Sequence, residues 1–185
     1  MNFAAEYPLQ QKIKLCVINN GVGCVIKSIV AVGLNGEIGS NGKLPWEGTF
    51  SEDQQWYMDN TLNAVRIGCS GSIKTIDDER EFYIVSARDI TAPGSLGIYN
   101  WKTMKPHEIL QDVQAKHPDK DVFVVGGVPW YEASAYAVEQ LLITRINGSY
   151  AHDRAVDLDV LLRNRKCMKS WHGQSTPDLC FEIWE

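Results

Sequence analysis

The chain has 185 residues, of which 44% are hydrophobic and 22% are charged, a composition typical of one folded domain with a substantial buried core. Its net charge of −5 argues against a general nucleic-acid or anionic-membrane binder, because either activity needs a basic face. The five cysteines and four histidines show no zinc-ligand or metalloprotease spacing, so we expect reduced thiols and no metal site.

The N-terminal part of the chain predicts a hairpin that leads into a core strand. Residues 12–18 and 23–32 are both rich in Val and Ile, and an Asn-Asn-Gly turn sequence lies between them. The run 28–32 is continuously apolar after its serine, which is typical of a strand covered on both faces.

A helix is expected after the glycine-rich stretch 33–42. Ser51 is predicted to be its N-cap, because a hydroxyl at that position accepts a hydrogen bond from the first turn. Glu52 and Asp53 place acids in that turn, where the helix dipole favours them. The helix should continue through Leu62.

The rest of the chain alternates between strands and helices. One helix should open at Pro106 and another should cover 129–137, since proline suits a first turn. Strands are expected at 64–68, 82–86, 121–125, 140–146 and 179–184. This alternation predicts a single α/β domain, in which helices flank a mostly parallel central sheet and the C-terminal strand forms an antiparallel edge. The periodicity does not give the strand order.

Ligands of an open α/β sheet bind where the carboxyl ends of the strands meet loops. Gly126 and Gly127 lie between a strand and a helix, where the backbone can approach a ligand and the helix N-terminus favours a phosphate. Residues 68–72 offer small side chains and hydroxyls after another strand, and Asp53 offers an acid. Each also has a simpler interpretation: a plain turn, a solvated loop and an exposed first-turn acid.

Several motifs occur along the chain in one order. They are Gly-Glu-Ile-Gly at 36–39, Leu-Pro-Trp at 44–46, the acidic helix at Asp53 and Gly-Gly-x-x-x-Tyr at 126–131. Together, this set resembles the dihydrofolate reductase family over residues 27–184. The resemblance implies a domain with that fold at 25–185, preceded by an N-terminal extension at 1–24 that adds an edge hairpin or a contact surface.

The resemblance also implies a catalytic group of Asp53, Trp46 and Thr144. Asp53 would be the one carboxylate of a pterin pocket, and Thr144 would hydrogen-bond it and fix its orientation. Burial should raise the pKa of Asp53, because burial disfavours the charged form. The acid would then help to protonate the nitrogen beside the carbon that receives hydride.

Two sets of ligand-binding residues follow from the same resemblance. The substrate set is Val30, Ala31, Leu44, Asp53, Tyr57, Ile76, Arg80, Val125 and Thr144. The set for the cofactor, NADPH, is Ala31, Ile38, Gly39, Leu44, Cys69, Ser70, Gly71, Ser72, Ser86, Arg88, Val125, Gly126, Gly127, Val128 and Tyr131. Leu44 and the glycine-rich loop should close over the nicotinamide and exclude water.

Arg80 corresponds to the family arginine that pairs with the glutamate carboxylate of the substrate. The planar fork of a guanidinium suits that bidentate task. From the residues alone, a surface ion pair with Asp77, Asp78 or Glu79 is an equal alternative.

The chain departs from the family at the phosphate site. The family usually carries Gly-Arg-x-Thr where this chain has Cys-Ser-Gly-Ser at 69–72, so Ser72 keeps a hydroxyl but the arginine is missing. Losing a charge-assisted bond of roughly 1.5–3 kcal/mol weakens binding on the order of tenfold to a hundredfold. Either Arg88 or Lys74 supplies the contact instead, or the preference for the 2′-phosphate is relaxed.

Two segments also differ from the family in length. The stretch before Asp53 is longer, which makes Glu52 an alternative acid, although helical geometry turns it away from the face of Asp53. The stretch after Ser72 is shorter, and leaves Thr75 and Ile76 to line the site of the substrate's benzoyl portion.

The resemblance predicts an NADPH-dependent reductase that converts 7,8-dihydrofolate to tetrahydrofolate for one-carbon and thymidylate metabolism. A folate- or nucleotide-binding interaction module with little turnover, and a reductase of another pterin or a pyrimidine, are the alternatives. No apolar run is long enough to span a bilayer, and the N-terminus lacks the order of a signal peptide. We therefore expect a cytoplasmic monomer whose partners are dihydrofolate and NADPH, without nucleic acid or membrane.

Overall fold

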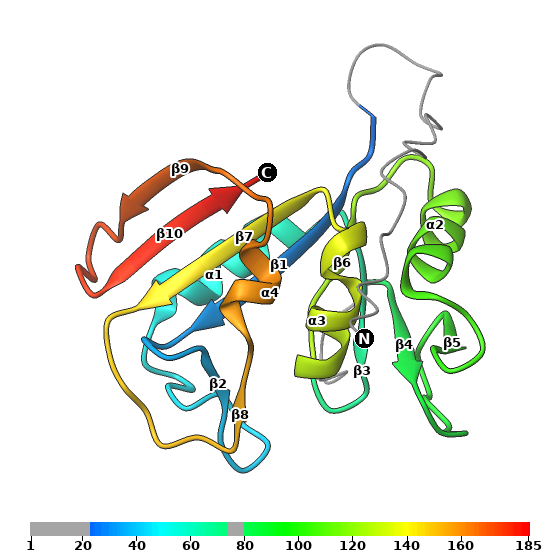
Figure 1. Cartoon of the computed structure of the whole chain (residues 1–185), viewed down its shortest axis with the longest axis horizontal. Coiled ribbons are helices and arrows are strands. Elements are labelled where there is room, and N and C mark those ends of the chain that lie inside the picture. The colour runs from blue at the N-terminus through cyan, green and yellow to red at the C-terminus, as the bar shows by residue number, and fades with distance from the viewer. Residues whose placement is uncertain (1–22, 74–79) are drawn as a thin grey trace, which may run out of the picture.

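An eight-stranded sheet organises the molecule (Figure 1). The computed structural model describes residues 23–73 and 80–185. The strand order is β5-β4-β3-β6-β1-β7-β10-β9. The bounds are β1 Ile26–Val32, β3 Val65–Cys69, β4 Phe82–Ser86, β5 Gly97–Asn100, β6 Val122–Val124, β7 Gln140–Ile146, β9 Cys167–His172 and β10 Leu179–Trp184.

The pairing confirms the predicted fold class. All neighbours from β5 to β7 are parallel, whereas β10 pairs antiparallel with both β7 and β9. The antiparallel edge therefore consists of two strands, and β9, rather than the C-terminal strand, lies outermost. β6 and most of β7 are buried, which explains why their sequences are continuous apolar runs instead of alternating patterns.

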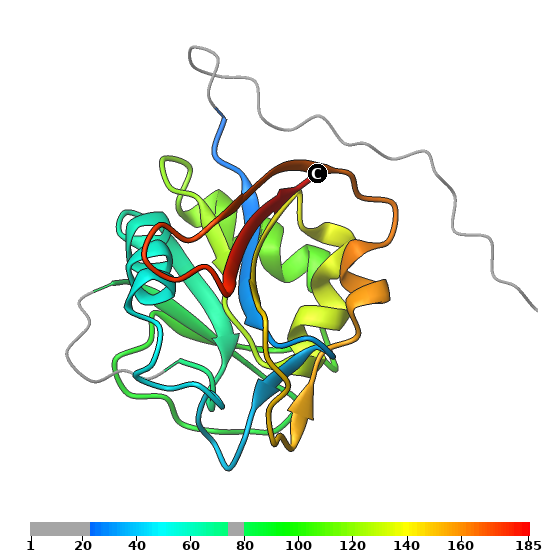
Figure 2. The same ribbon diagram turned by 90° about the vertical axis from the view of Figure 1, so that its left-hand side faces the viewer.

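Helices cover both faces of the sheet (Figure 2). On one face lie α2 (Pro106–Lys116), α3 (Val128–Ser134) with the 3-10 turn η1 (Ala135–Ala137), and α4 (Leu158–Leu162). These helices bury side chains such as Ile109, Trp130 and Leu161 in the larger core cluster. The other face is covered by α1 (Ser51–Thr61), whose Trp56 and Tyr57 pack against a second cluster.

The start of α1 differs from the prediction. Phe50, not Ser51, is the N-cap residue, and no side-chain hydrogen bond caps the helix within the described residues. Phe50 instead packs beside a cluster that contains Trp46 and Phe181. Apolar packing of the preceding residue therefore sets where this helix begins, and α1 ends at Thr61, one residue before the predicted end.

The predictions missed several short elements. β2 (Glu37–Gly39) and β8 (Arg154–Ala155) form a separate two-stranded ribbon, and β5, α4 and β9 were also not predicted. Most residues of β9 are exposed, so its sequence lacks the apolar alternation that would have indicated a strand. The predicted helix at 129–137 is α3 followed by η1. The predicted hairpin strand at 12–18 lies outside the described residues.

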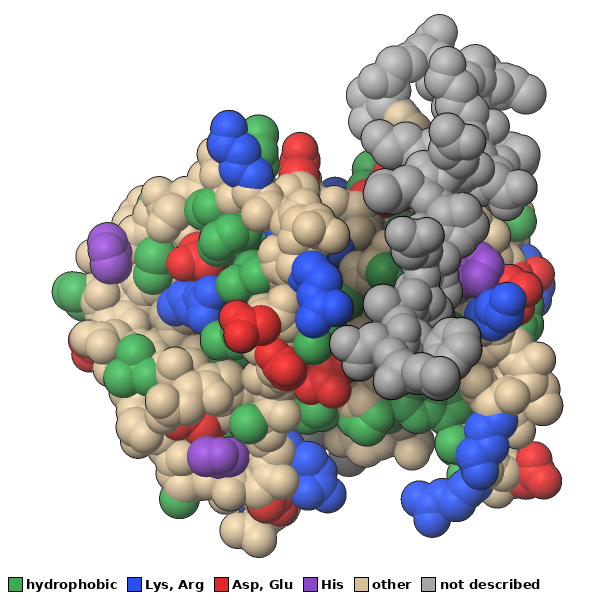
Figure 3. All heavy atoms as spheres, viewed as in Figure 1, with side chains coloured by type: hydrophobic (Ala, Val, Ile, Leu, Met, Phe, Trp, Pro, Cys, Tyr) green, Lys and Arg blue, Asp and Glu red, His purple; other side chains and the backbone are tan. Residues whose placement is uncertain are grey.

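The visible surface mixes both signs of charge. In Figure 3, Lys and Arg side chains are scattered over this face between acidic groups and form no continuous basic patch. Within the described parts of the chain, the four cysteines Cys24, Cys69, Cys167 and Cys180 are free thiols, and no group of three or more His, Cys, Asp or Glu side chains is arranged to hold a metal ion. None of the helices described has the length and apolar character needed to cross a membrane.

Arg165 ties the end of α4 to the segment that leads into β7. Its side chain donates to the backbone oxygens of Leu161 (3.0 Å) and Glu139 (3.2 Å), and to those of Ala135 (2.9 Å) and Val138 (2.6 Å). One guanidinium thus donates to carbonyl groups of α4, of η1 and of the segment between η1 and β7.

Replacing Arg165 should destabilise the fold. We expect Arg165→Met to lower the free energy of unfolding by about 1.5–3 kcal/mol, because partly buried carbonyls lose charged donors. Urea denaturation measures the change. The control Arg163→Met, at an exposed arginine, should change the free energy by less than about 0.5 kcal/mol. Equal effects of the two substitutions would contradict this role.

Candidate active site

Asp53 and Thr144 come together beside the carboxyl end of β1. Thr144 lies on β7, where its register partners are Ala31 on one side and Phe181 on the other. Asp53 projects from the first turn of α1, which packs on the same face of the sheet. The structure thus brings together the two polar residues that the sequence placed in one site.

Burial dominates the electrostatics of Asp53. It raises the pKa of this carboxyl above its ordinary value of 3.8, while the Thr144 hydroxyl acts in the opposite direction. The direction agrees with the prediction, and the physical cause is the loss of hydration for the charged form. Asp53 can therefore hold a proton at a higher pH than an exposed aspartate.

The Thr144 hydroxyl faces this carboxyl and lowers its pKa by a side-chain hydrogen-bond interaction. The contact is loose, because the buried Thr144 oxygen has no partner that meets the full distance and angle of a hydrogen bond among the described residues. The predicted pairing of Asp53 with Thr144 is therefore present as a loose contact. The indole Nε1 atoms of Trp46 and Trp56 are likewise buried and unpartnered within the described residues. Buried polar atoms in this state point to positions that a ligand or water fills.

The loop before α1 carries one buried and one exposed apolar residue. Trp46 is only 4% exposed and packs edge-on against Tyr150, with ring centroids 5.2 Å apart. Leu44 is 46% exposed, although it is large and apolar. Trp46 therefore anchors the loop to the core, whereas Leu44 stays free to cover a ligand.

The predicted substrate residues divide between the two faces of the sheet. Tyr57 and Val125 belong to the cluster under α1, on the side of Asp53. The side chain of Val30 belongs to the cluster under α2 and α3. Val30 is therefore able to contact a ligand beside Asp53 only through its backbone. Ile76 lies outside the described residues.

The two glycine-containing segments meet at the ends of β3 and β6. These strands are neighbours, so the turn after Cys69 lies against Gly126 and Gly127, which are joined by a cis peptide bond. The amide of Cys69 donates to the Gly126 oxygen at 2.7 Å. A Cβ on Gly126 would lie 2.8 Å from the Ser72 hydroxyl, and one on Gly68 would lie 2.5 Å from the Gly126 oxygen. Only glycines allow this close approach of the two segments.

Three predicted cofactor residues have different environments here. Burial raises the pKa of the Cys69 thiol, and a hydrogen bond from the Gly127 amide acts in the opposite direction. The net pKa is raised, so Cys69 is a neutral thiol at the base of the turn. Tyr131 is buried and donates its hydroxyl to the Ile29 oxygen at 2.7 Å. A cofactor contact by Tyr131 would therefore come from its ring. Ser70 is exposed.

Arg80 lies at the far end of α1 from Glu52. Its guanidinium donates to the Thr61 hydroxyl and lies 5.1 Å from the ring centroid of Tyr57. The backbone oxygen of Arg80 accepts a bond from the buried Arg66 at 2.9 Å. These contacts hold the guanidinium beside the helix that carries Asp53. The alternative partners Asp77, Asp78 and Glu79 are not among the described residues.

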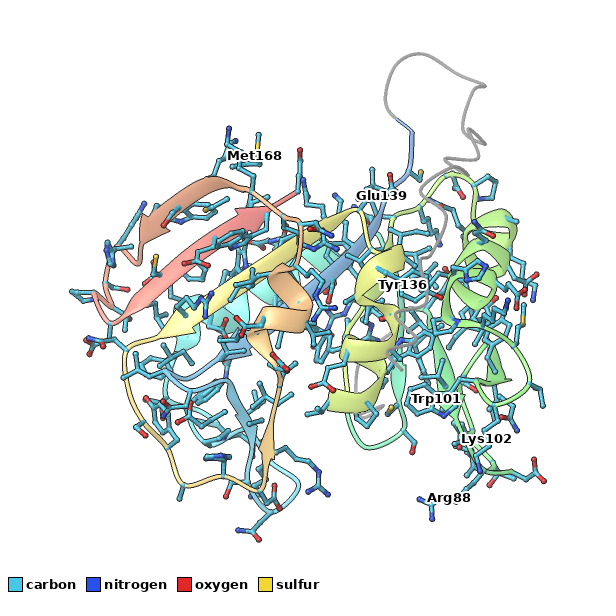
Figure 4. All side chains as sticks on the ribbon, in the orientation of Figure 1. Arg88, Trp101, Lys102, Tyr136, Glu139 and Met168 are labelled. Carbon is cyan, nitrogen blue, oxygen red and sulfur yellow. The ribbon has the colours of Figure 1, made fainter. Side chains whose placement is uncertain are left out.

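Two exposed cations lie where β4 and β5 end. Ser86 and Asn100 are register partners on these strands, and Arg88 and Lys102 each follow by two residues. The Ser86 hydroxyl accepts from the Arg88 amide at 3.0 Å, and the Asn100 side chain accepts from the Lys102 amide at 3.0 Å. Figure 4 shows Arg88 and Lys102 at the same end of the sheet, next to Trp101. Lys74, the other candidate, lies outside the described residues.

Comparison with known proteins agrees with this geometry. The sequence model of dihydrofolate reductase matches residues 25–159. The chain belongs to the dihydrofolate reductase family. It is therefore an oxidoreductase of this family.

Individual relatives of this family show where the similarity lies. A dihydrofolate reductase of Mycoplasma pneumoniae is 28% identical over 138 residues, which cover 73% of this chain and 84% of that protein. A dihydromethanopterin reductase of Methylorubrum extorquens is also 28% identical, over 136 residues that cover 71% of this chain and 90% of that protein. The fold is similar to that of dihydrofolate reductase from Enterococcus faecalis complexed with NADP(H) and RAB-propyl, with a TM-score of 0.67 at 16% identity, over 89% of this chain and 98% of that one.

The sequence reasoning missed a buried carboxylate beside the active-site loop. Glu37, with 0% of its surface exposed, accepts bonds from the amide (2.7 Å) and the side chain (2.9 Å) of Asn35. It also accepts bonds from the Ser149 hydroxyl (3.3 Å) and the Tyr150 amide (3.5 Å), both after β7. A Cβ on Gly33 would lie 2.5 Å from the carboxylate, so a glycine there makes room for it. The signal in the sequence was an acid between glycines, which composition alone did not distinguish from a loop residue.

The hydrogen bonds to Glu37 outweigh its desolvation. Burial alone would raise its pKa, but the donors from Asn35, from its own backbone and from Tyr150 lower it from 4.5 to about 2. The charged form of Glu37 therefore joins the glycine-rich segment around Asn35 to the loop after β7, at Ser149 and Tyr150. Such a bond is present in the folded protein only, so it contributes to stability.

Glu37→Gln should lower stability in a pH-dependent way. The folded pKa lies below the unfolded one, so the contribution of Glu37 is complete above pH 4.5 and is lost as the pH falls toward 2. We expect the variant to lose roughly 1–2 kcal/mol at neutral pH, because an amide replaces a charged acceptor and its NH2 group cannot accept the bonds from Asn35 and Tyr150. The gap from the native protein should narrow below pH 4.5 in urea titrations. A gap independent of pH would contradict the role of the charge.

Proposed function

We propose that this protein reduces 7,8-dihydrofolate to tetrahydrofolate with hydride from NADPH. One observation carries the proposal: a carboxyl group whose pKa is raised by burial faces a buried hydroxyl without a close partner among the described residues. A pterin presents an amino group and a ring nitrogen side by side, which suit an acid and a hydroxyl in this arrangement. The product would enter one-carbon and thymidylate metabolism, and we propose a cytoplasmic monomer.

Asp53 would act on the substrate as an orienting acid. Its carboxyl binds the amino and ring-nitrogen edge, and Thr144 donates to or accepts from the same edge. Because burial raises its pKa, Asp53 is available to assist protonation of the ring nitrogen next to the carbon that receives hydride. Trp46 holds the loop closed beside it, and Leu44 excludes water from the reacting atoms.

The residues at the ends of β3 and β6 fit a dinucleotide. When bound, NADPH supplies the hydride. Gly126 and Gly127 allow the backbone to approach the cofactor, and Ser72 places a hydroxyl beside them. Ala31, Ile38, Gly39 and Leu44 would flank the nicotinamide, and the turn 69–72 would meet the phosphates. Ser86 and Arg88 extend the site along the sheet edge, with Val128 and Tyr131 at its base.

Arg88 and Lys102 are proposed to replace the missing phosphate arginine. Both are exposed cations at the carboxyl ends of adjacent strands, and their backbones are held by Ser86 and Asn100. Charge from neighbouring loops can attract the 2′-phosphate that distinguishes NADPH from NADH.

A related pterin is the second candidate substrate. The relatives include a dihydromethanopterin reductase whose identity to this chain equals that of the dihydrofolate reductase, so family membership alone does not decide between the two pterins. Arg80 supports folate, because its guanidinium lies beside Tyr57 on the helix that carries Asp53, where a substrate carboxylate would meet it.

The reaction is tested by following NADPH absorbance with dihydrofolate across pH. We expect the native protein to oxidise NADPH only when dihydrofolate is present. Near neutral pH, Asp53→Asn should lower this rate by about a hundredfold, because the variant loses the proton carrier. The loss should shrink at acidic pH, where the substrate is protonated by solvent. Asp59→Asn, an exposed change on the same helix, is the control and should keep the native rate.

Two results would redirect the proposal. Turnover with dihydromethanopterin and not with dihydrofolate would select the second candidate. Folate binding without turnover by folded protein, with NADPH or NADH, would indicate a binding module instead of an enzyme.

The phosphate contact is tested by direct binding. Arg88→Ala and Lys102→Ala should each weaken NADPH binding roughly tenfold, the value of one charge-assisted bond, and leave NADH binding unchanged. Quenching of tryptophan fluorescence measures both affinities without turnover. Arg163→Ala, at an exposed arginine directly after α4, is the control. Unchanged NADPH affinity in both variants would show that neither cation reads the phosphate.

A further inference from the structure

The helix that carries Asp53, α1, has few stabilising features within its own sequence. Within the described residues, α1 has no side-chain cap at its start, no basic residue in its last turn, and a single fully buried residue, Thr61. Its sequence is also polar on most sides. The position of Asp53 therefore depends on contacts that α1 makes with segments distant in the sequence.

One such contact is made by the neighbour of Asp53. The Glu52 carboxylate accepts a bond from the Gln174 amide at 2.6 Å, and bonds from the Ser175 amide at 3.3 Å and hydroxyl at 3.2 Å. These donors lie in the turn between β9 and β10, here called the 173–178 turn. The Gln174 amide foremost lowers the pKa of Glu52, so the acceptor is charged.

The same turn is shaped to receive the carboxylate. A Cβ on Gly173 would lie 2.8 Å from a Glu52 oxygen and 2.5 Å from the backbone oxygen of Thr176. No larger residue fits at 173 unless the turn or Glu52 moves. The closest approach is to the backbone of the turn itself, so glycine at 173 gives the turn the shape in which it receives Glu52.

Aromatic rings continue the contact one helical turn further along. Trp56 lies 5.2 Å from Trp171 on β9 and 5.4 Å from Phe181 on β10, measured between ring centroids, and Trp171 stacks on Phe181 at 5.7 Å. Phe181 is also the register partner of Thr144. The hairpin of β9 and β10 therefore contacts both elements of the site. Its strand β10 pairs with β7, which carries Thr144, and its turn and aromatic rings pack against α1, which carries Asp53.

We propose that the 173–178 turn is a positioning element for the active-site acid, and that Glu52 is the positioning residue through which it acts. The hairpin sets the spacing between Asp53 and Thr144, because it contacts both of their elements. Its release lets α1 move outward and admits water to Asp53. The inference rests on the proposed function for its catalytic meaning, but its test does not require turnover.

The test is the titration of Asp53 in the ligand-free, full-length protein. Carbon NMR follows its carboxyl carbon, which is assigned by its loss in Asp53→Asn. Tyr131, which interacts electrostatically with Asp53, Tyr57 and Cys69, lies near this carboxyl. The adjacent carboxylate, Glu52, also titrates, and its signal is told apart by its loss in Glu52→Gln. Gly173→Ala keeps every charge and disrupts the turn. We expect it to lower the Asp53 midpoint toward 3.8, by roughly half a pH unit or more, as hydration returns.

Two further variants separate position from charge. Glu52→Gln should also lower the midpoint, and Asp59→Asn, with the same loss of charge elsewhere on α1, should leave it unchanged. Near-UV circular dichroism should show a changed signal from Trp56 and Trp171 in Gly173→Ala and Glu52→Gln only. If Gly173→Ala does not fold, Ser175→Ala removes one donor and should give a smaller shift in the same direction.

An unchanged Asp53 midpoint in Gly173→Ala, or in Ser175→Ala where that variant replaces it, would overturn the proposal. A shift in Glu52→Gln alone would overturn it as well, since the effect would then be one of charge. A shifted midpoint in protein that never reduces dihydrofolate would sustain the positioning role and reject the proposed function.

Discussion

The site depends on the burial of one carboxyl group. Asp53 is half-buried where α1 packs on the sheet, and its pKa rises because the charged form loses hydration. Burial without a cation partner costs stability, so a fold keeps such a group only if surrounding contacts hold it. Those contacts come from Trp56 and Tyr57 in the cluster under α1 and from the hairpin that reaches Glu52.

The sheet order supplies the second half of the site. Because β3 lies beside β6, the turn at 69–72 meets the Gly126-Gly127 peptide, and the absence of side chains at Gly68 and Gly126 allows the two backbones to touch. Because β1 lies between β6 and β7, the same edge also carries Thr144 and Ala31. A parallel sheet therefore brings Asp53, Thr144 and the Gly126-Gly127 peptide to one edge, although they are dispersed along the chain.

Charge is distributed in two distinct ways around this edge. The carboxylate of Glu37 is buried, hydrogen-bonded and charged down to low pH, and it fixes loop geometry. Arg88 and Lys102 stay exposed at the strand ends, where they are available to an anionic ligand. Buried charge thus serves the architecture, and exposed charge is proposed to serve recognition.

Much of the fold was predictable because its elements carry strong local signals. The apolar runs of β1, β6 and β7, the proline at the start of α2 and the paired glycines after β6 all depend on neighbouring residues in the sequence. The residues of the site were also indicated by their order along the chain. Their exact geometry was not, since the Thr144 hydroxyl meets Asp53 only in a loose contact.

The sequence by itself determined the α/β class and the main strands, because hydrophobic period and turn chemistry are local properties, and the order of its motifs indicated the proposed acid. Only the tertiary structure decided the N-cap of α1, the edge strand β9, the burial of Glu37 and the grip of Glu52 on the 173–178 turn. Each of these depends on residues that are far apart in the chain, and a local pattern contains no information about which distant backbone amide a carboxylate will meet.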